Sequence, residues 1–188
     1  LDEKNIPVIR RISGGGTVFH DDGNLNYSVI TKSEKREQLV DFISFTTPII
    51  EFLKSFELKA EFSGKNNLTI NGKKFSGNSA HVHKKRVLHH GTLLFNSNLN
   101  VLEKAITPAD YKITDKAVKS VRAEVTNLST LIKDSITITD FQNKFLSFIR
   151  SYYNITEEYE LTEEDINNIN KLVDTKYSKW EWNYGYSP

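Results

Sequence analysis

Residues 10–26 read RRISGGGTVFHDDGNLN, and the rest of the chain is interpreted outward from this stretch. Its three consecutive glycines, residues 14–16, permit positive φ angles and a close approach of the backbone to a ligand. Successive N–H groups in such a turn can converge on an anion. Arg10 and Arg11 precede the glycines and bring planar forks of donors that suit a phosphate or a carboxylate. The stretch therefore predicts a site that holds an anion against bare backbone.

Two familiar phosphate-binding motifs do not fit this stretch. The nucleoside-triphosphate loop needs Lys-Ser/Thr after its last glycine, and neither residue pair follows here. The dinucleotide fingerprint needs a helix after its glycines, whereas residues 17–20 alternate like a strand. The remaining alternative is a glycine-rich hairpin corner with two surface arginines. The flanking Arg-Arg and His-Asp-Asp-Gly-Asn favour the anion site.

Composition and charge narrow the class of protein. The chain has 188 residues, 38% of them apolar, which suits one domain with a substantial core. Its formal net charge of +1 argues against a broad surface for nucleic acid or membrane. The sequence contains no apolar run long enough to predict a membrane span. We expect a cytoplasmic protein. The absence of Cys excludes disulfides and thiol catalysis by these residues.

Strand patterns dominate the first half of the chain. Strands are predicted at 6–12, 17–20, 25–31, 58–62 and 87–95, and a turn at 21–24. A helix with an apolar stripe begins in the charged segment 33–38, and Pro48 should kink or interrupt it. Asn71-Gly72 lies between two β-type runs and predicts a tight hairpin. Lys74 then lies just past the turn, and Gly77 should interrupt the second strand.

Helical patterns follow. Residues 99–105 predict a short helix, and Thr139 with Gln142 predicts a capping box for a longer one. Thr162 should cap a last helix, and the aromatic tail at 180–185 should dock on the domain. The buried face of the longer helix is predicted to comprise Phe141, Phe145, Phe148, Ile149 and Tyr152. These patterns together predict an α+β fold, an antiparallel or mixed β-sheet with helices packed on it.

Three segments together resemble the lipoate–protein ligase family. They are residues 10–21 (RRISGGGTVFHD), residues 72–79 (GKKFSGNS) and residues 89–94 (HHGTLL). Residues 120–122, 125–128 and 180–183 continue the likeness in the expected order over nearly the whole chain. The resemblance implies the catalytic-domain fold shared with biotin–protein ligases and octanoyltransferases. Members begin with further strands and a helix, so we expect residues 1–188 to be a single catalytic domain without its N-terminal strands.

The resemblance implies a two-step, ATP-dependent reaction. Lipoate and ATP, which carries Mg²⁺, would give lipoyl-adenylate and pyrophosphate. The acyl group would then pass to a lysine of a lipoyl domain of a 2-oxoacid dehydrogenase complex or of the glycine-cleavage H protein. Lys74 matches the family lysine between the α-phosphate and the lipoate carboxyl, and is the expected catalytic residue. The positions expected to bind nucleotide or lipoate are Arg11, Ser13, Gly14, Gly15, Gly16, Thr17, Val18, Phe19, His20, Asn67, Ser76, Gly77 and His90.

The residues suit this chemistry. A carboxylate that attacks an α-phosphate must overcome the repulsion between two anions, and fixed N–H groups and cations offset it. The transfer step develops an oxyanion that the Lys74 ammonium can hold. Neither step needs a protein nucleophile.

Several residues keep a second interpretation. Many relatives read Asn-Asp where this chain reads Asn66-Asn67, so the residues that would bind a metal are left open. Lys74 could be a surface lysine of the hairpin, although its neighbours favour the catalytic role. His90 fits a ligand contact and a structural hydrogen bond equally well. His81 and His83 fit a surface position better than a zinc site. The Lys-rich loop 112–119 is solvated, or orders over the adenylate as in the family.

Two competing functions use the same fold. An ATP-independent octanoyl- or lipoyl-transferase generally acts through a Cys thiolate, and residues 60–65, where it is expected, read AEFSGK. A module that binds lipoate or adenylate without turnover would not need Lys74.

Overall fold

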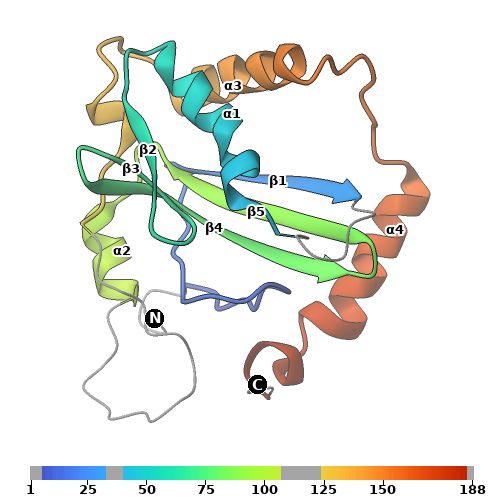
Figure 1. Cartoon of the computed structure of the whole chain (residues 1–188). Coiled ribbons are helices and arrows are strands. Elements are labelled where there is room, and N and C mark those ends of the chain that lie inside the picture. Colours follow the sequence, from blue (N-terminus) through green and yellow to red (C-terminus); the bar gives the residue numbers. More distant parts are fainter. Residues whose placement is uncertain (1–5, 33–39, 107–123, 186–188) are drawn as a thin grey trace. The chain divides into compact units, whose positions relative to one another are not determined.

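The computed structural model describes residues 6–32, 40–106 and 124–185 (Figure 1). Its contacts gather into two compact units. The smaller unit comprises Leu1–Ile12 and Ile155–Pro188, and the larger unit comprises Ser13–Asn154. Within the described ranges, no helix is both long enough and apolar enough to cross a membrane.

The larger unit is built on a five-stranded antiparallel sheet with the order β1-β5-β4-β3-β2. Its strands are β1 (Asn24–Lys32), β2 (Ala60–Ser63), β3 (Asn67–Ile70), β4 (Lys73–His83) and β5 (Arg86–Leu94). The first half of β4 pairs with β3 and its second half pairs with β5, so this strand joins the two halves of the sheet (Figure 1). The predicted sheet is thereby confirmed as antiparallel.

The β3–β4 hairpin forms where its turn residues predict it. Asn71 and Gly72 have φ angles of 51° and 76°, the positive values that a two-residue turn of this kind requires. Ile70 and Lys73 pair across the turn, which places Lys74 at the start of β4 as expected. The strand continues through Gly77, so the predicted interruption there is wrong.

Helices α1 (Phe42–Lys54) and α3 (Ile138–Tyr152) pack on one face of the sheet and build the core. The ring of Phe52 on α1 lies 5.3 Å from Phe141 and 5.0 Å from Phe145 of α3, measured between centroids. Leu68 and Leu93 contribute the sheet's side of this core. Helix α2 (Leu99–Ile106) and the 3₁₀ turn η2 (Leu128–Thr130) complete the larger unit.

Residues 6–12 and 17–20 form no strand, contrary to the prediction. A β-type sequence becomes a strand only when a neighbour completes its ladder, and β1 pairs instead with β5. Pro7 also lacks the N–H group that a ladder needs. The predicted turn at 21–24 is present and leads directly into β1.

Helix α1 begins at Phe42 and runs through Pro48 without interruption. The Asp41 carboxylate caps it by accepting from the Ser44 N–H at 3.0 Å. The hydroxyl of Thr47 donates to the Ile43 carbonyl at 2.8 Å, in the turn before the proline. The predicted start at 33–38 lies outside the described residues.

The capping box of α3 lies two residues before its predicted position. Thr137 and Asp140 form it, because the helix begins at Ile138 and Thr139 already lies inside the first turn. Phe141 and Phe145 are buried as expected, whereas 43% of Tyr152 is exposed at the helix end.

The smaller unit contains α4 (Glu163–Leu172) and the π-helical turns η3 (Val173–Tyr177) and η4 (Glu181–Gly185). Thr162 caps α4 as predicted, and Asp165 completes the capping box. The aromatic tail packs on the N-terminal segment of the same unit. Trp182 Nε1 donates to the Arg10 carbonyl at 2.9 Å, and the Arg10 N–H donates to Asn183 Oδ1 at 2.9 Å.

Candidate active site

The strand register assigns the candidate residues to one face of the sheet. Cross-strand partners share a face, and β4 and β5 pair Ser79 with His90. Side chains alternate along β5, and Leu93 points into the core beneath α1 and α3. His90 and Ser79 therefore lie on the opposite face, which is not covered by the core helices.

The glycine turn, residues 13–16, is docked on this face by two hydrogen bonds. Ser13 Oγ lies 2.5 Å from His90 Nε2, and Ser79 Oγ donates to the Gly14 carbonyl at 2.8 Å. Gly15 has a φ of 106°, a conformation that favours glycine. A Cβ at Gly14 would meet no atom within 4 Å, so the turn keeps an open side. His90 thus has the structural hydrogen bond that was one of its two interpretations.

A β-bulge in β4 aims Lys74 at the same face. Leu68 pairs with Ser76 and Thr69 with Lys74, so Phe75 is an extra residue in the ladder. Phe75 is fully buried in the core. Because the extra residue breaks the alternation, Lys74 lies on the face of Gly77 instead of the core face.

The Lys74 side chain lies across Gly77. An ideal Cβ built on Gly77 would stand 3.0 Å from Lys74 Nζ and 3.1 Å from Lys74 Cε. Gly77 therefore provides the space that the lysine occupies. Burial lowers the pKa of the Lys74 ammonium from its usual value, because the charged form loses hydration.

The segment 124–128 holds the backbone of Lys74 from its other side. The Lys74 N–H donates to the Glu124 carbonyl at 2.7 Å, and the Thr126 N–H donates to the Lys74 carbonyl at 3.0 Å. Asn127 fixes this segment through both of its amide atoms, which bond the backbone of Ser97 at 3.0 and 2.9 Å. Residues 125–128 belong to the segments of family likeness, and the structure gives them and Glu124 a supporting role at Lys74.

A buried polar network supports the strands on the core side. Tyr27 Oη donates to Asn78 Oδ1, and Asn78 Nδ2 donates to the Asn66 carbonyl at 3.0 Å. The Asn66 side chain donates back to the Asn78 carbonyl. A Cβ at Gly91 would lie 2.2 Å from Asn78 Oδ1 and 2.5 Å from Tyr27 Oη, so only glycine fits there. Sequence reasoning assigned no role to Tyr27, Asn78 or Gly91; the isolated glycine in a strand pattern, Gly91, was the available signal.

The network bears on two other predicted positions. Asn66 precedes Asn67, which pairs with Gly77 in the register. Ser76 is buried on the core side, where Asn78 Nδ2 approaches its hydroxyl at 3.4 Å. Burial raises the pKa of the Tyr27 phenol, which stays a neutral donor to Asn78.

The remainder of the opening stretch has structural partners. Asp21 accepts from the Gly23 N–H at 3.0 Å and from the Asn98 N–H at 2.7 Å. His20 Nδ1 lies 3.1 Å from the Asn24 amide. Thr17 and Val18 are exposed and Phe19 is partly buried. Arg11 belongs to the smaller unit.

A protein-built metal centre is not visible in the part of the chain that the structure describes. No three His, Asp or Glu side chains of these residues gather where they could hold an ion. Asn67 offers an uncharged amide oxygen, and such a ligand suits an ion that brings other oxygen ligands with it.

Comparison with known proteins identifies the family that the sequence segments resemble. Residues 1–150 match the family model of the lipoyl protein ligase A/B catalytic domain. Lipoate–protein ligase 1 of Staphylococcus aureus is 42% identical over 188 residues, which cover 100% of this chain and 57% of that protein. The chain thus spans little more than half of this relative's length.

Solved structures agree with this match. A bipartite lipoate protein ligase from Thermoplasma acidophilum has a TM-score of 0.82 and 28% identity, with 100% of this chain and 74% of that chain covered. A lipoate-protein ligase A bound with ATP has a TM-score of 0.80 and 26% identity, with 98% and 74% covered. Because the family model covers residues 1–150 and the relatives align along the chain, this protein belongs to the lipoyl protein ligase A/B catalytic-domain family.

Proposed function

We propose that this chain is the catalytic domain of an ATP-dependent lipoate–protein ligase. The observation that carries the proposal is the placement of Lys74, whose ammonium lies over Gly77 on the face where the glycine turn is docked. A related ligase A is bound with ATP, and the relatives are named lipoate–protein ligases. These findings support a reaction that begins with ATP and a carboxylic acid.

In the first step, a lipoate carboxylate oxygen attacks the α-phosphorus of ATP. A bond forms between that oxygen and phosphorus, the bond to the bridging oxygen breaks, and pyrophosphate leaves. Lys74 offsets the repulsion between carboxylate and phosphate, and its partial desolvation strengthens its attraction for both. The open side of the glycine turn offers backbone N–H groups to the phosphates.

In the second step, the amine of an acceptor lysine attacks the acyl carbonyl of lipoyl-adenylate. The amide bond forms, the nitrogen gives up one proton to solvent, the mixed anhydride bond breaks, and AMP leaves with the electron pair. The same Lys74 ammonium stabilises the oxyanion of the tetrahedral intermediate. No protein nucleophile takes part, in keeping with a chain that has no Cys.

The proposal includes Mg²⁺ on the ATP phosphates, where Asn67 can supply one amide oxygen from the strand beside Gly77. It also keeps Arg11, residues 16–19 and His20 as nucleotide- or lipoate-binding positions, whereas Ser76 lies on the core side of the sheet and is not kept. The acceptors are lipoyl domains of 2-oxoacid dehydrogenase complexes or the glycine-cleavage H protein, and the location is cytoplasmic. A Thermoplasma relative was solved as a lipoylation system with an E2 lipoyl domain, which supports this class of acceptor.

Incubation of the full-length protein with lipoate and an apo lipoyl domain tests the proposal. The acceptor mass, read by intact mass spectrometry, should increase by one lipoyl group only when ATP is present, and pyrophosphate should be released. Octanoyl transfer from a carrier protein at full rate without ATP would instead indicate a transferase. Binding of lipoyl-adenylate without turnover would indicate a binding module.

A further inference from the structure

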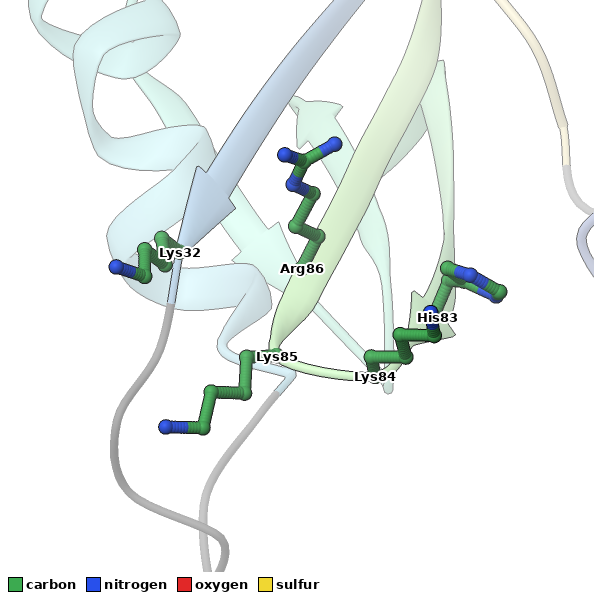
Figure 2. A pocket seen from close by; sticks show the side chains of 5 residues that line it. All are labelled: Lys32, His83, Lys84, Lys85 and Arg86. Carbon is green, nitrogen blue, oxygen red and sulfur yellow. The ribbon is translucent and has the colours of Figure 1, made fainter.

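A concave feature lies at the β4–β5 hairpin, next to the end of β1 (Figure 2). We call this feature the basic hollow. Its lining consists of Lys32, His83, Lys84, Lys85 and Arg86, and its volume is ≈ 600 Å³. Four of the five lining side chains are Lys or Arg, although the whole chain has a net charge of only +1. Among the described residues, no carboxylate lines the basic hollow.

The strand register places the basic hollow on the face of the candidate active site. Arg86 pairs with Lys32 on one side and with His83 on the other, so these three residues form one row. His90, which holds the glycine turn, lies four residues along β5 on the same face. At the usual strand rise, the row is about 13 Å from His90.

Lys84 has a backbone conformation that suits glycine better than lysine. Its φ is +54°, and it is the first residue of a two-residue loop between His83 and Arg86. Gly and Asn adopt this region at less cost than other residues do. The hairpin thus presents a cation at its tip at a cost in local stability. Functional surfaces are where such departures from local preference are expected.

One row of the sheet separates the basic hollow from the glycine turn. Leu88 pairs with Ile30 on one side and with His81 on the other, and 70% of Ile30 is exposed. Exposed aliphatic surface bordered by charge is typical of a protein interface. A site for nucleic acid needs a wider positive field than a chain of net charge +1 provides. These observations favour an acidic protein as the occupant.

We propose that the basic hollow docks an acidic surface of the acceptor protein, the domain whose lysine receives the acyl group. This inference rests on the proposed function. Gly77, beneath the Lys74 ammonium, and His83 are six residues apart on β4, which is about 20 Å. An acceptor that brings its lysine to Lys74 covers this distance on the same face, because small domains are about 30 Å across. The basic hollow then steers and orients the acceptor.

Two variants test the docking role with an apo lipoyl domain as the probe. Lys84→Gly removes one charge and relieves the positive φ, and Arg86→Gln removes another charge at similar length. Each variant should raise the KM for the apo lipoyl domain about 2- to 5-fold, the range of a single exposed charge pair. The double variant should raise it further and weaken its dependence on salt. Lys84→Gly should also raise the thermal midpoint of unfolding.

Lys144→Gln is the matched control, because Lys144 is an exposed cation on α3. This helix packs on the opposite face of the sheet from the basic hollow. It should leave the KM for the apo lipoyl domain unchanged. Adenylate formation from ATP and lipoate is measured separately for every variant and should remain normal. If the wild-type protein forms no adenylate, the proposed function fails. If adenylate forms but the variants keep the wild-type KM for the acceptor, the docking inference is wrong.

Polyphosphate and duplex DNA serve as competing probes. An acidic fragment of the lipoyl domain should inhibit acyl transfer by the wild-type protein and should inhibit the Lys84→Gly variant less. This result supports protein docking. If the variants lose affinity for polyphosphate or DNA while their KM for the apo lipoyl domain is unchanged, the basic hollow binds a polyanion and the inference is overturned.

Discussion

Both proposed half-reactions depend on Lys74, because the proposal brings the lipoate carboxyl and the α-phosphate to its ammonium. Lys74→Ala should slow adenylate formation and acyl transfer by about 10²- to 10³-fold each, the scale of losing one oxyanion donor. Lys74→Arg should be similarly slow, since a planar fork does not replace a point charge over Gly77. The half-reactions are assayed separately, with ATP and lipoate or with synthetic lipoyl-adenylate. Near-normal rates in both assays would make Lys74 a surface residue.

Gly77 sets the position of that ammonium. A Cβ in Gly77→Ala would stand 3.0 Å from Lys74 Nζ, the far end of a flexible side chain. The lysine should therefore move while the fold remains, and kcat should fall about 10-fold, as about 1.4 kcal/mol of lost stabilisation implies. In a Lys74→Ala background the same change should have no further effect on kcat. Equal losses in both backgrounds would show that Gly77 acts independently of Lys74.

At the scale of elements, the pairing of β1, β4 and β5 depends on Gly91. Gly91→Ala would place a Cβ 2.2 Å from Asn78 Oδ1 and 2.5 Å from Tyr27 Oη, two atoms fixed in one hydrogen bond inside the sheet. Neither side chain has free space, so we expect a loss of about 1–3 kcal/mol in the free energy of unfolding. Urea denaturation measures it. An unchanged midpoint would mean that the strands separate there at little cost.

The same network has a hydrogen-bond contribution. Asn78→Ala would leave the Tyr27 hydroxyl without its acceptor and would remove one of the two hydrogen bonds that the Asn66 carbonyl accepts from Asn78. Each unpaired buried group costs about 1–3 kcal/mol, so this variant should be at least as unstable as Gly91→Ala. Its adenylate formation should fall as well, because Asn66 precedes Asn67 in the strand beside Gly77. Denaturation and the adenylate assay, made on the same samples, separate the two effects.

At the scale of the whole molecule, one buried histidine makes stability depend on pH. His89 lies beneath α1 with its ring 4.9 Å from that of Phe45, and burial lowers the pKa of the imidazole. Asp41 opposes this shift more weakly. Since the unfolded chain takes up the proton at a higher pH, stability is complete above about pH 6.5 and declines as pH falls below it.

The His89→Phe variant should remove part of this decline. Its ring can keep the stack on Phe45 without a titrating group. The free energy of unfolding, measured between pH 5 and 8, should fall less steeply with acid than in the parent protein. If the free energy of unfolding declined equally with acid in both proteins, the pH dependence would belong to other groups.

Local sequence chemistry determined a large part of this molecule. Asn71-Gly72 specified its hairpin because both residues tolerate positive φ, and Thr162 specified the start of α4 through its cap. The apolar periodicity specified the buried face of α3 around Phe141 and Phe145. The glycine turn and the segments of family likeness led to the correct family. Each of these signals is contained in a few neighbouring residues.

Only the tertiary structure determined which face of the sheet carries the side chains of the candidate site. The bulge at Phe75 turns Lys74 onto the face of Gly77, and this depends on the pairing of β3 with β4. Residues 6–12 and 17–20 have β-type sequences but form no strand, since β1 takes the place beside β5. The contact between Gly91 and Tyr27 joins residues far apart along the chain. Such features follow from register between distant strands, and the free energy that sets register is spread over the whole core instead of any one motif.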